Sequence, residues 1–165
     1  METPNSLFFE LLETAKIEGA IPSSGKILVN REAASLFAHL FKRLEYEMEV
    51  FCEWPPDNLS QETGFEEACF IAVFDYGSLS RLFNSDGRKY IKACGRKLTS
   101  GGLFLGVHTL AGCDSESGDS GISSQFVDLF DIFVEDFTLV SAGPRGLGRG
   151  TSGDPEIFLS IWRRL

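Results

Sequence analysis

Residues 26–44, KILVNREAASLFAHLFKRL, give the clearest indication of the fold, because a strand pattern is followed at once by the best-defined helix pattern in the chain. Residues 27–29 are consecutive and apolar, as in strands buried on both faces of a parallel sheet. Asn30 is a good N-cap for a helix that begins directly after it. Apolar residues then recur with helical periodicity, which predicts an amphipathic helix. These are Ala33, Leu36, Phe37, Leu40, Phe41 and Leu44.

Strand and helix patterns alternate on both sides of this stretch. Further strands are predicted at residues 48–52, 69–74, 103–107, 137–141 and 156–162, and further helices at 6–15, 86–98 and 126–133. Such alternation forms β-α-β units, and hence a parallel sheet covered on both faces. The last two strands have no helix between them and are expected to pair antiparallel. The sequence thus predicts an α/β fold: a Rossmann-like, mostly parallel sheet of about six strands with helices on both faces and an antiparallel C-terminal strand pair.

Length and composition favour one domain, residues 1–165, because 43% of the 165 residues are apolar. The net charge of −9, without a cluster of Lys and Arg, argues against a nucleic-acid partner. The longest apolar run, residues 69–74, is far shorter than the roughly 20 residues that span a bilayer. The N-terminus also lacks the features of a signal peptide. We therefore expect a cytoplasmic protein without a membrane partner.

Cysteine and histidine usage points to no metal site. The four cysteines show no CxxC spacing, and the chain has two histidines. Three cysteines lie in apolar segments and are predicted to be small buried hydrophobes. These are Cys52, Cys69 and Cys94. Cys113 lies in a Ser/Gly/Asp-rich stretch, where an exposed cysteine or a reactive thiol would fit.

Three stretches, taken together, resemble the thiol and thiopurine methyltransferase branch of the class I S-adenosylmethionine (SAM)-dependent enzymes. AIPSSGKILV (20–29) is similar to the run-in to the family's first strand, and FDYGSL (74–79) to the end of its fourth strand. LTSGGLFL (98–105) is similar to the bend into its fifth strand. The resemblance implies SAM as cofactor and a small thiol-type substrate.

The sequence departs from the family after the first strand. There the family has a GxGxG-type loop, whose missing β-carbons let the backbone approach the cofactor. Here residues 30–35 contain no glycine and include the carboxylate of Glu32. The family also places a helix, a strand and a helix before its third strand, which needs roughly 40 residues. Residues 30–47 suffice for one helix, so we expect the 48–52 strand to lie parallel and directly beside 26–29.

Four residues are candidates for cofactor binding. The resemblance implies an acidic residue beside the adenine, which Glu49 or Glu53 would match; a surface glutamate is the alternative for each. Asp75 and Tyr76 follow a central strand, at the edge where ligands of open α/β sheets bind. The alternatives are a turn-forming Asp and a packed Tyr. No catalytic residue is assigned, because methyl transfer to a thiol depends on proximity and makes a role for His108 optional.

Two glycine-rich stretches, residues 111–123 and 142–154, are predicted to be loops. Within the second stretch, residues 148–153 match GxGxxG. A dinucleotide fingerprint needs a strand before it and a helix after it, whereas a strand comes next here. Residues 111–123 and 142–154 are predicted to be the most mobile internal segments, because both have few large apolar side chains.

The predicted function is that of a methyltransferase-like protein, degenerate and weak or inactive as an enzyme, with SAM binding weak or lost. Two alternatives stay open at this point: a non-catalytic binding or regulatory partner derived from the fold, and a truncated product without activity. The corresponding ligands are a small thiol-type substrate or a protein partner.

Overall fold

The computed structural model describes residues 4–17, 21–22, 24–51, 68–77, 85–110, 130–145 and 156–165. Its elements are α1 (Pro4–Ile17), β1 (Gly25–Asn30), α2 (Arg31–Arg43), β2 (Tyr46–Phe51), β3 (Phe70–Tyr76), α5 (Ser85–Lys97), β4 (Leu98–Leu110), β5 (Phe137–Arg145) and β6 (Glu156–Arg164). The strands form one sheet of six in the order β2-β1-β3-β4-β6-β5. The first four are parallel, and β6 is antiparallel to both β4 and β5. The predicted fold class is therefore confirmed.

The neighbouring positions of β1 and β2 confirm the prediction made from the short connection. The two strands pair in parallel, with Ile27 opposite Met48 and Val29 opposite Val50. The helix α2 connects them and packs against β2, β1 and β3. Its apolar stripe explains this packing, because Phe37 and Phe41 are almost completely buried.

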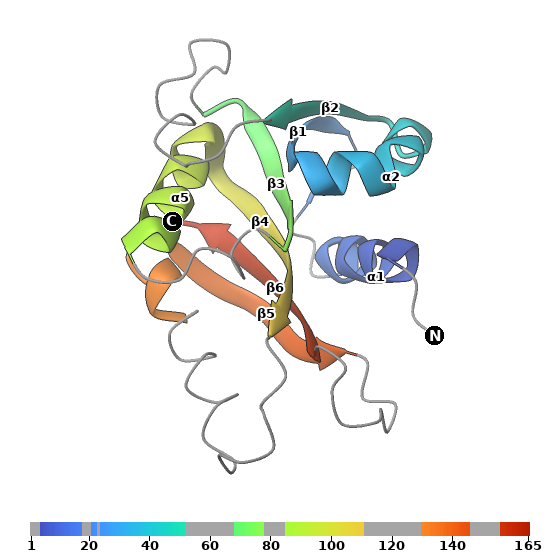
Figure 1. Ribbon diagram of the computed structural model, residues 1–165. Coiled ribbons are helices and arrows are strands. Elements are labelled where there is room, and N and C mark those ends of the chain that lie inside the picture. Colours follow the sequence, from blue (N-terminus) through green and yellow to red (C-terminus); the bar gives the residue numbers. More distant parts are fainter. Residues whose placement is uncertain are drawn as a thin grey trace.

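Helices cover the sheet on both sides, as Figure 1 shows. One core lies between the sheet and α1 with α2; its members include Leu11, Phe37, Val29, Phe74 and Leu105. A second core lies between the sheet and α5; its members include Leu28, Val73, Tyr90, Phe104 and Trp162. Adjacent strand residues thus serve opposite cores, which is why the central strands are apolar without alternation.

Several element boundaries differ from the sequence prediction, and those of β3, β4 and β5 matter most for the candidate residues and loops. The strand β3 continues through Asp75 and Tyr76, so Asp75 does not form a turn. The strand β4 already begins at Leu98, and Gly101 lies inside it with a φ of 74°, beside an irregularity in the β3–β4 register. The strand β5 extends to Arg145, so the glycine-rich connection predicted from residue 142 starts later.

Several predictions lie outside the described residues. These are the loop at 111–123, the start of the 126–133 helix, the later part of the connection between the last two strands, and Cys52, Cys113 and Glu53. Cys94 is buried, as predicted, and Cys69 is half-buried. Within the described part of the chain, no helix is long and apolar enough to cross a membrane.

Candidate functional site

The candidate site is the edge of the sheet where the parallel strands end, because ligands of open α/β sheets bind beyond the carboxyl ends of strands. No residue separates β1 from α2 at this edge. Asn30 is the last residue of β1 and also the N-cap of α2, and its Oδ1 accepts a hydrogen bond from the Ala33 amide at 3.0 Å. The strand therefore enters the helix directly, as the sequence pattern predicts.

The same Asn30 side chain joins β1 to β3. Its Oδ1 also accepts a hydrogen bond from the Tyr76 amide at 3.2 Å, and its Nδ2 donates to the Tyr76 carbonyl at 3.1 Å. Asn30 is 5% exposed, whereas Tyr76 is half-buried, so these two bonds are partly buried. The carboxamide thus occupies the junction between two strand ends and a helix start.

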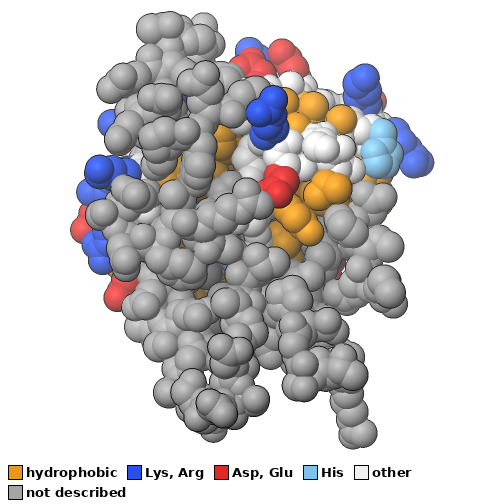
Figure 2. All heavy atoms as spheres, viewed as in Figure 1, with side chains coloured by type: hydrophobic (Ala, Val, Ile, Leu, Met, Phe, Trp, Pro, Cys, Tyr) orange, Lys and Arg blue, Asp and Glu red, His pale blue; other side chains and the backbone are white. Residues whose placement is uncertain are grey.

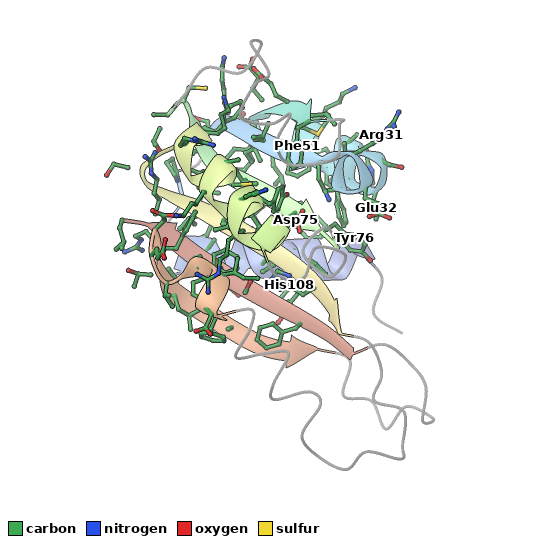
Figure 3. All side chains as sticks on the ribbon, turned by 60° about the vertical axis from the view of Figure 1, so that its left-hand side comes forward. Arg31, Glu32, Phe51, Asp75, Tyr76 and His108 are labelled. Atoms are coloured by element: carbon green, nitrogen blue, oxygen red, sulfur yellow. The ribbon has the colours of Figure 1, made fainter. Side chains whose placement is uncertain are left out.

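A carboxylate lies beside this junction. Glu32 is in the first turn of α2, where a negative charge is favoured by the helix dipole. Burial raises the pKa of the Tyr76 hydroxyl, and the negative charge of Glu32 raises it further. Gly77, with a φ of 76°, follows β3, and a β-carbon there would lie 3.7 Å from Glu32 Oε2. Figure 3 shows Glu32 and Tyr76 near one another at this edge.

Asp75 and Tyr76 come together at the end of β3 but face opposite sides of the sheet, as consecutive strand residues do. The Tyr76 ring contacts Phe37 of α2, with centroids 5.9 Å apart. The Asp75 side chain is completely buried on the α5 side, where its Oδ1 accepts a hydrogen bond from the Tyr90 hydroxyl at 2.8 Å. Asp75 therefore faces the second core.

Asp75 also affects a neighbouring thiol. The side chain of Cys94 is completely buried, and this burial is the main reason why its pKa lies well above the ordinary value. The carboxylate of Asp75 raises the thiol pKa further. Cys94 is thus held as a neutral thiol, which is the unreactive form.

Glu49 does not lie with Asp75 and Tyr76. It belongs to β2, two strands away from β3, and two residues before that strand ends. Its carboxylate lies 3.7 Å from Nζ of Lys26, and both side chains are about one-third exposed, at 32% and 40%. This geometry matches the alternative of a surface glutamate with a weak ion pair.

The structure brings His108 into a buried pair that the sequence prediction missed. Its Nε2 lies 2.6 Å from Ser160 Oγ on β6, and its ring stacks on Phe158. Burial lowers the pKa of His108 to about 3, so the imidazole is neutral at pH 7. The ring lies over Gly106, where an added β-carbon would approach Nε2 to 2.5 Å. A glycine two residues before a histidine within a strand is the local signal for this arrangement.

The pair has limited chemical capability. His108 is 1% exposed and Ser160 is 0% exposed, so neither reaches a substrate in solution. The Nδ1 atom of His108 has no hydrogen-bond partner within the described residues. Among those residues there is also no group of three His, Cys, Asp or Glu side chains that could hold a metal ion.

Comparison with known proteins identifies solved structures with a similar fold. No protein-family model matches the chain, and no curated protein matches its sequence. Solved structures do match over almost the whole chain. A provisionally assigned methyltransferase from Bacillus halodurans has a TM-score of 0.62 and 10% identity, covering 94% of this chain and 98% of that one. A Galdieria sulphuraria protein, provisionally assigned as a sarcosine dimethylglycine methyltransferase, has a TM-score of 0.65 and 9% identity, covering 94% and 84%.

A third similar structure was solved with S-adenosyl-L-homocysteine bound. Geranyl diphosphate C-methyltransferase from Streptomyces coelicolor, solved with Mg²⁺, geranyl diphosphate and S-adenosyl-L-homocysteine (SAH), has a TM-score of 0.58 and 10% identity, covering 98% of this chain and 80% of that one. Identities this low establish the fold alone. The chain therefore shares its α/β fold with these methyltransferase structures.

Proposed function

We propose that this chain is a non-catalytic protein with a methyltransferase fold, in which SAM binding is weak or lost and binding of a protein partner is the retained role. The observation that carries the proposal is the Asn30 junction. Three hydrogen bonds from its carboxamide connect β1, the start of α2 and the end of β3 at the position where the family holds its cofactor. A truncated product without activity is the alternative.

The residues at this junction do not fit SAM held in the family's manner. That manner requires main-chain amides that a ligand can approach closely, and glycines provide this access. Here the amide of Ala33 is already bonded to the Asn30 side chain, and residues 30–35 contain no glycine. A methionine carboxylate would also meet the like charge of Glu32, which electrostatics disfavours.

Two of the candidate cofactor-binding residues, Asp75 and Glu49, already interact with other side chains. The Asp75 carboxylate is bonded to Tyr90 on the α5 side, and Glu49 lies near Lys26 within the outermost wing of the sheet. Each lost polar contact costs about 1 kcal/mol. Because about 1.4 kcal/mol corresponds to a factor of ten in affinity, the loss of several contacts weakens binding by orders of magnitude.

The kinship with the thiol and thiopurine branch is part of the same proposal. It is supported by three sequence stretches, residues 20–29, 74–79 and 98–105. If methyl transfer is retained at any level, the proposed acceptor is a small thiol. A radiolabelled SAM assay with a panel of small thiols tests this, and we expect no transfer above the rate without protein.

Isothermal titration with SAM and with SAH tests the main proposal. We expect no saturable heat up to about 1 mM of either ligand. This means that the binding free energy is expected to be less favourable than the about 4 kcal/mol that corresponds to a millimolar dissociation constant. A methyltransferase that binds SAM serves as positive control, and cooperative thermal unfolding shows that the titrated protein is folded. Saturable one-to-one binding in the low micromolar range would overturn the proposal. The variant Glu32→Gln would then test whether the ligand lies at the Asn30 junction, because it keeps the side-chain volume and removes the carboxylate beside that junction.

A further inference from the structure

The outer face of α5 carries a stripe of positive charge. The inner face packs on the second core through residues such as Tyr90 and Ile91. From residue 87 to residue 97, every exposed side chain is cationic. These side chains, here called the basic stripe, are Arg88, Lys89, Lys92 and Arg96. At about 3.6 residues per turn they lie within an arc of about 100° and extend about 12 Å along the helix axis.

The helix gathers cations that the sequence keeps apart. Buried residues separate Lys89 from Lys92 and Lys92 from Arg96, so the sequence itself shows no continuous run of Lys and Arg. The stripe also contrasts with the whole chain, which has a net charge of −9. Figure 2 shows Lys and Arg side chains along the edge of the molecule where α5 lies in Figure 1. The acidic protein therefore has a local positive surface.

The stripe already holds one carboxylate of this chain. Nζ of Lys92 lies 2.9 Å from Oε2 of Glu135, and Nη1 of Arg88 lies 3.9 Å from Oε1. A hydrogen bond from Lys92 lowers the pKa of Glu135, so this side chain is an anion at neutral pH. Among the residues that the structure describes, Lys89 and Arg96 form no ion pair, and both side chains are exposed. These two cations are thus accessible to a further anion.

The surface favours a short acidic segment of a protein over a long polyanion. Val134, directly before Glu135, is 57% exposed, so an apolar side chain lies close to the stripe. Electrostatic repulsion acts over about 8 Å at physiological ionic strength. A nucleic acid or an anionic membrane extends well beyond the stripe and would be repelled by the acidic remainder of the protein. A peptide segment can match the length of the stripe and also cover Val134.

We propose that the basic stripe of α5 docks an acidic segment of a protein partner, in which Asp or Glu alternates with apolar residues. In an extended chain alternate residues are about 6.6 Å apart, close to the about 6 Å that separates residues four apart on a helix. The partner's carboxylates would pair with Lys89 and Arg96 and would compete with Glu135 for the other two cations. This names the partner chemistry for the binding role in the proposed function, on which it rests. The SAM titration and peptide binding at α5 concern different parts of the chain, so either can fail without the other.

The test uses an eight-residue peptide that alternates Glu with Val and carries a fluorophore. Binding to the full chain is measured by fluorescence anisotropy at about 0.15 M salt, where charges far from the site are screened. Changes in the amide NMR shifts of the protein locate the bound peptide. We expect saturable one-to-one binding with a dissociation constant below about 1 mM and the largest shift changes at residues 88–97 and 134–135. A control peptide with Gln in place of Glu should bind at least about tenfold more weakly, because it lacks the carboxylates.

Charge-reversal variants separate the stripe from the other cations of the protein. The double variant Lys89→Glu/Arg96→Glu should weaken binding of the Glu/Val peptide at least about fivefold. The matched control is Lys42→Glu/Arg43→Glu in the last turn of α2, since both positions are exposed and the net charge changes equally. The control should leave the affinity within about twofold, because screening limits the effect of distant charges. Thermal unfolding verifies that each variant is folded.

Removal of the internal competitor should have the opposite effect. Glu135→Gln keeps the side-chain volume and releases Arg88 and Lys92, so binding of the Glu/Val peptide should become about two- to fivefold tighter. Glu13→Gln on α1 is the matched control, because Glu13 is also exposed and lies 4.0 Å from Lys16. It changes the net charge equally and should leave the affinity within about 1.5-fold.

Four results would overturn the proposal. The first is no saturable binding of the Glu/Val peptide up to about 1 mM. The second is an equal effect of the α5 and α2 charge reversals, which would indicate attraction that is not specific to the stripe. The third is unchanged or weaker binding by Glu135→Gln, which would show that the peptide does not compete for the stripe. The fourth is equal or tighter binding of a single-stranded DNA with the same charge as the peptide, which would indicate a site for phosphates.

Discussion

The carboxamide of Asn30 bonds to the main chain of Tyr76 in both directions, accepting from its amide at 3.2 Å and donating to its carbonyl at 3.1 Å. The same oxygen caps α2 through the Ala33 amide. One side chain thus satisfies main-chain groups of two elements that are far apart in the sequence. Because buried main-chain groups need partners, this residue should be important for stability.

The first prediction concerns Asn30→Ala. Removing the carboxamide leaves the buried amide of Ala33 and the partly buried amide of Tyr76 without this acceptor. Loss of an N-cap costs about 1 kcal/mol, and an unsatisfied buried group costs about 1–3 kcal/mol more. We expect the free energy of unfolding, measured by urea denaturation, to fall by about 2–4 kcal/mol.

Asn30→Asp is the matched control for this change. It keeps the acceptor for both amides and removes the donor to the Tyr76 carbonyl. It should therefore lose less stability than Asn30→Ala. Equal stability of Asn30→Ala and the wild type would contradict the role assigned to the junction.

The second prediction concerns pH and His108. Burial lowers its pKa in the folded protein to about 3, from the ordinary value of 6.5. Between these values the unfolded chain binds a proton that the folded protein does not bind. The contribution of His108 to stability is therefore complete above pH 6.5 and is lost as the pH falls toward 3, by up to about 1.4 kcal/mol per pH unit.

Urea denaturation of the wild type and of His108→Gln between about pH 7 and pH 4 measures this contribution. Glutamine does not titrate, so the unfolding free energy of the variant should fall less steeply as the pH is lowered. The difference between the two slopes should correspond to the uptake of about one proton on unfolding. A wild-type slope in His108→Gln would show that this histidine does not couple folding to pH.

The third prediction concerns the turn between α2 and β2. Glu45 has a φ of 62°, in the left-handed region that side chains with a β-carbon adopt at a cost. Glycine adopts this region readily and is common just after helix ends. We expect Glu45→Gly to raise the free energy of unfolding by about 0.5–1 kcal/mol. Glu47→Gly, at an exposed position inside β2, should lower it by a similar amount. A lower free energy of unfolding in both variants would argue against backbone strain at Glu45.

The fourth prediction concerns the contact of His108 with Gly106. A β-carbon at Gly106 would lie 2.5 Å from Nε2 of the histidine, which is far closer than a normal contact. Gly106→Ala should therefore destabilise the protein by about 1–3 kcal/mol, as overpacking does. In the background of His108→Ala the same change should cost clearly less. The double-mutant cycle measures this coupling, and simple additivity would contradict the contact.

The order of strands and helices followed from local patterns. The apolar run of residues 27–29 predicted a buried parallel strand, and the helical stripe that includes Phe37 and Phe41 predicted α2. The short connection also predicted that β2 would lie beside β1. Boundaries were less accurate at β3 and β4. The sequence pattern ended one strand at residue 74, with a turn-forming Asp75 as one alternative, and placed a bend at Gly101. Pairing with β4 extends β3 through Asp75 and Tyr76. The strand β4 begins at Leu98, and Gly101 lies in the irregular part of the β3–β4 register.

The helices and strands could be predicted from the sequence, because periodicity, capping and connection length are properties of neighbouring residues. The hydrogen-bond partners could be identified only in the folded chain. Asn30 meets Tyr76 across 46 positions, and His108 meets Ser160 across 52. The assembled sheet also shows which elements these side chains meet: Asp75 contacts Tyr90 of α5, and Tyr76 contacts Phe37 of α2. The physical reason is that such pairs depend on the order and register of strands, which form only when the whole sheet assembles.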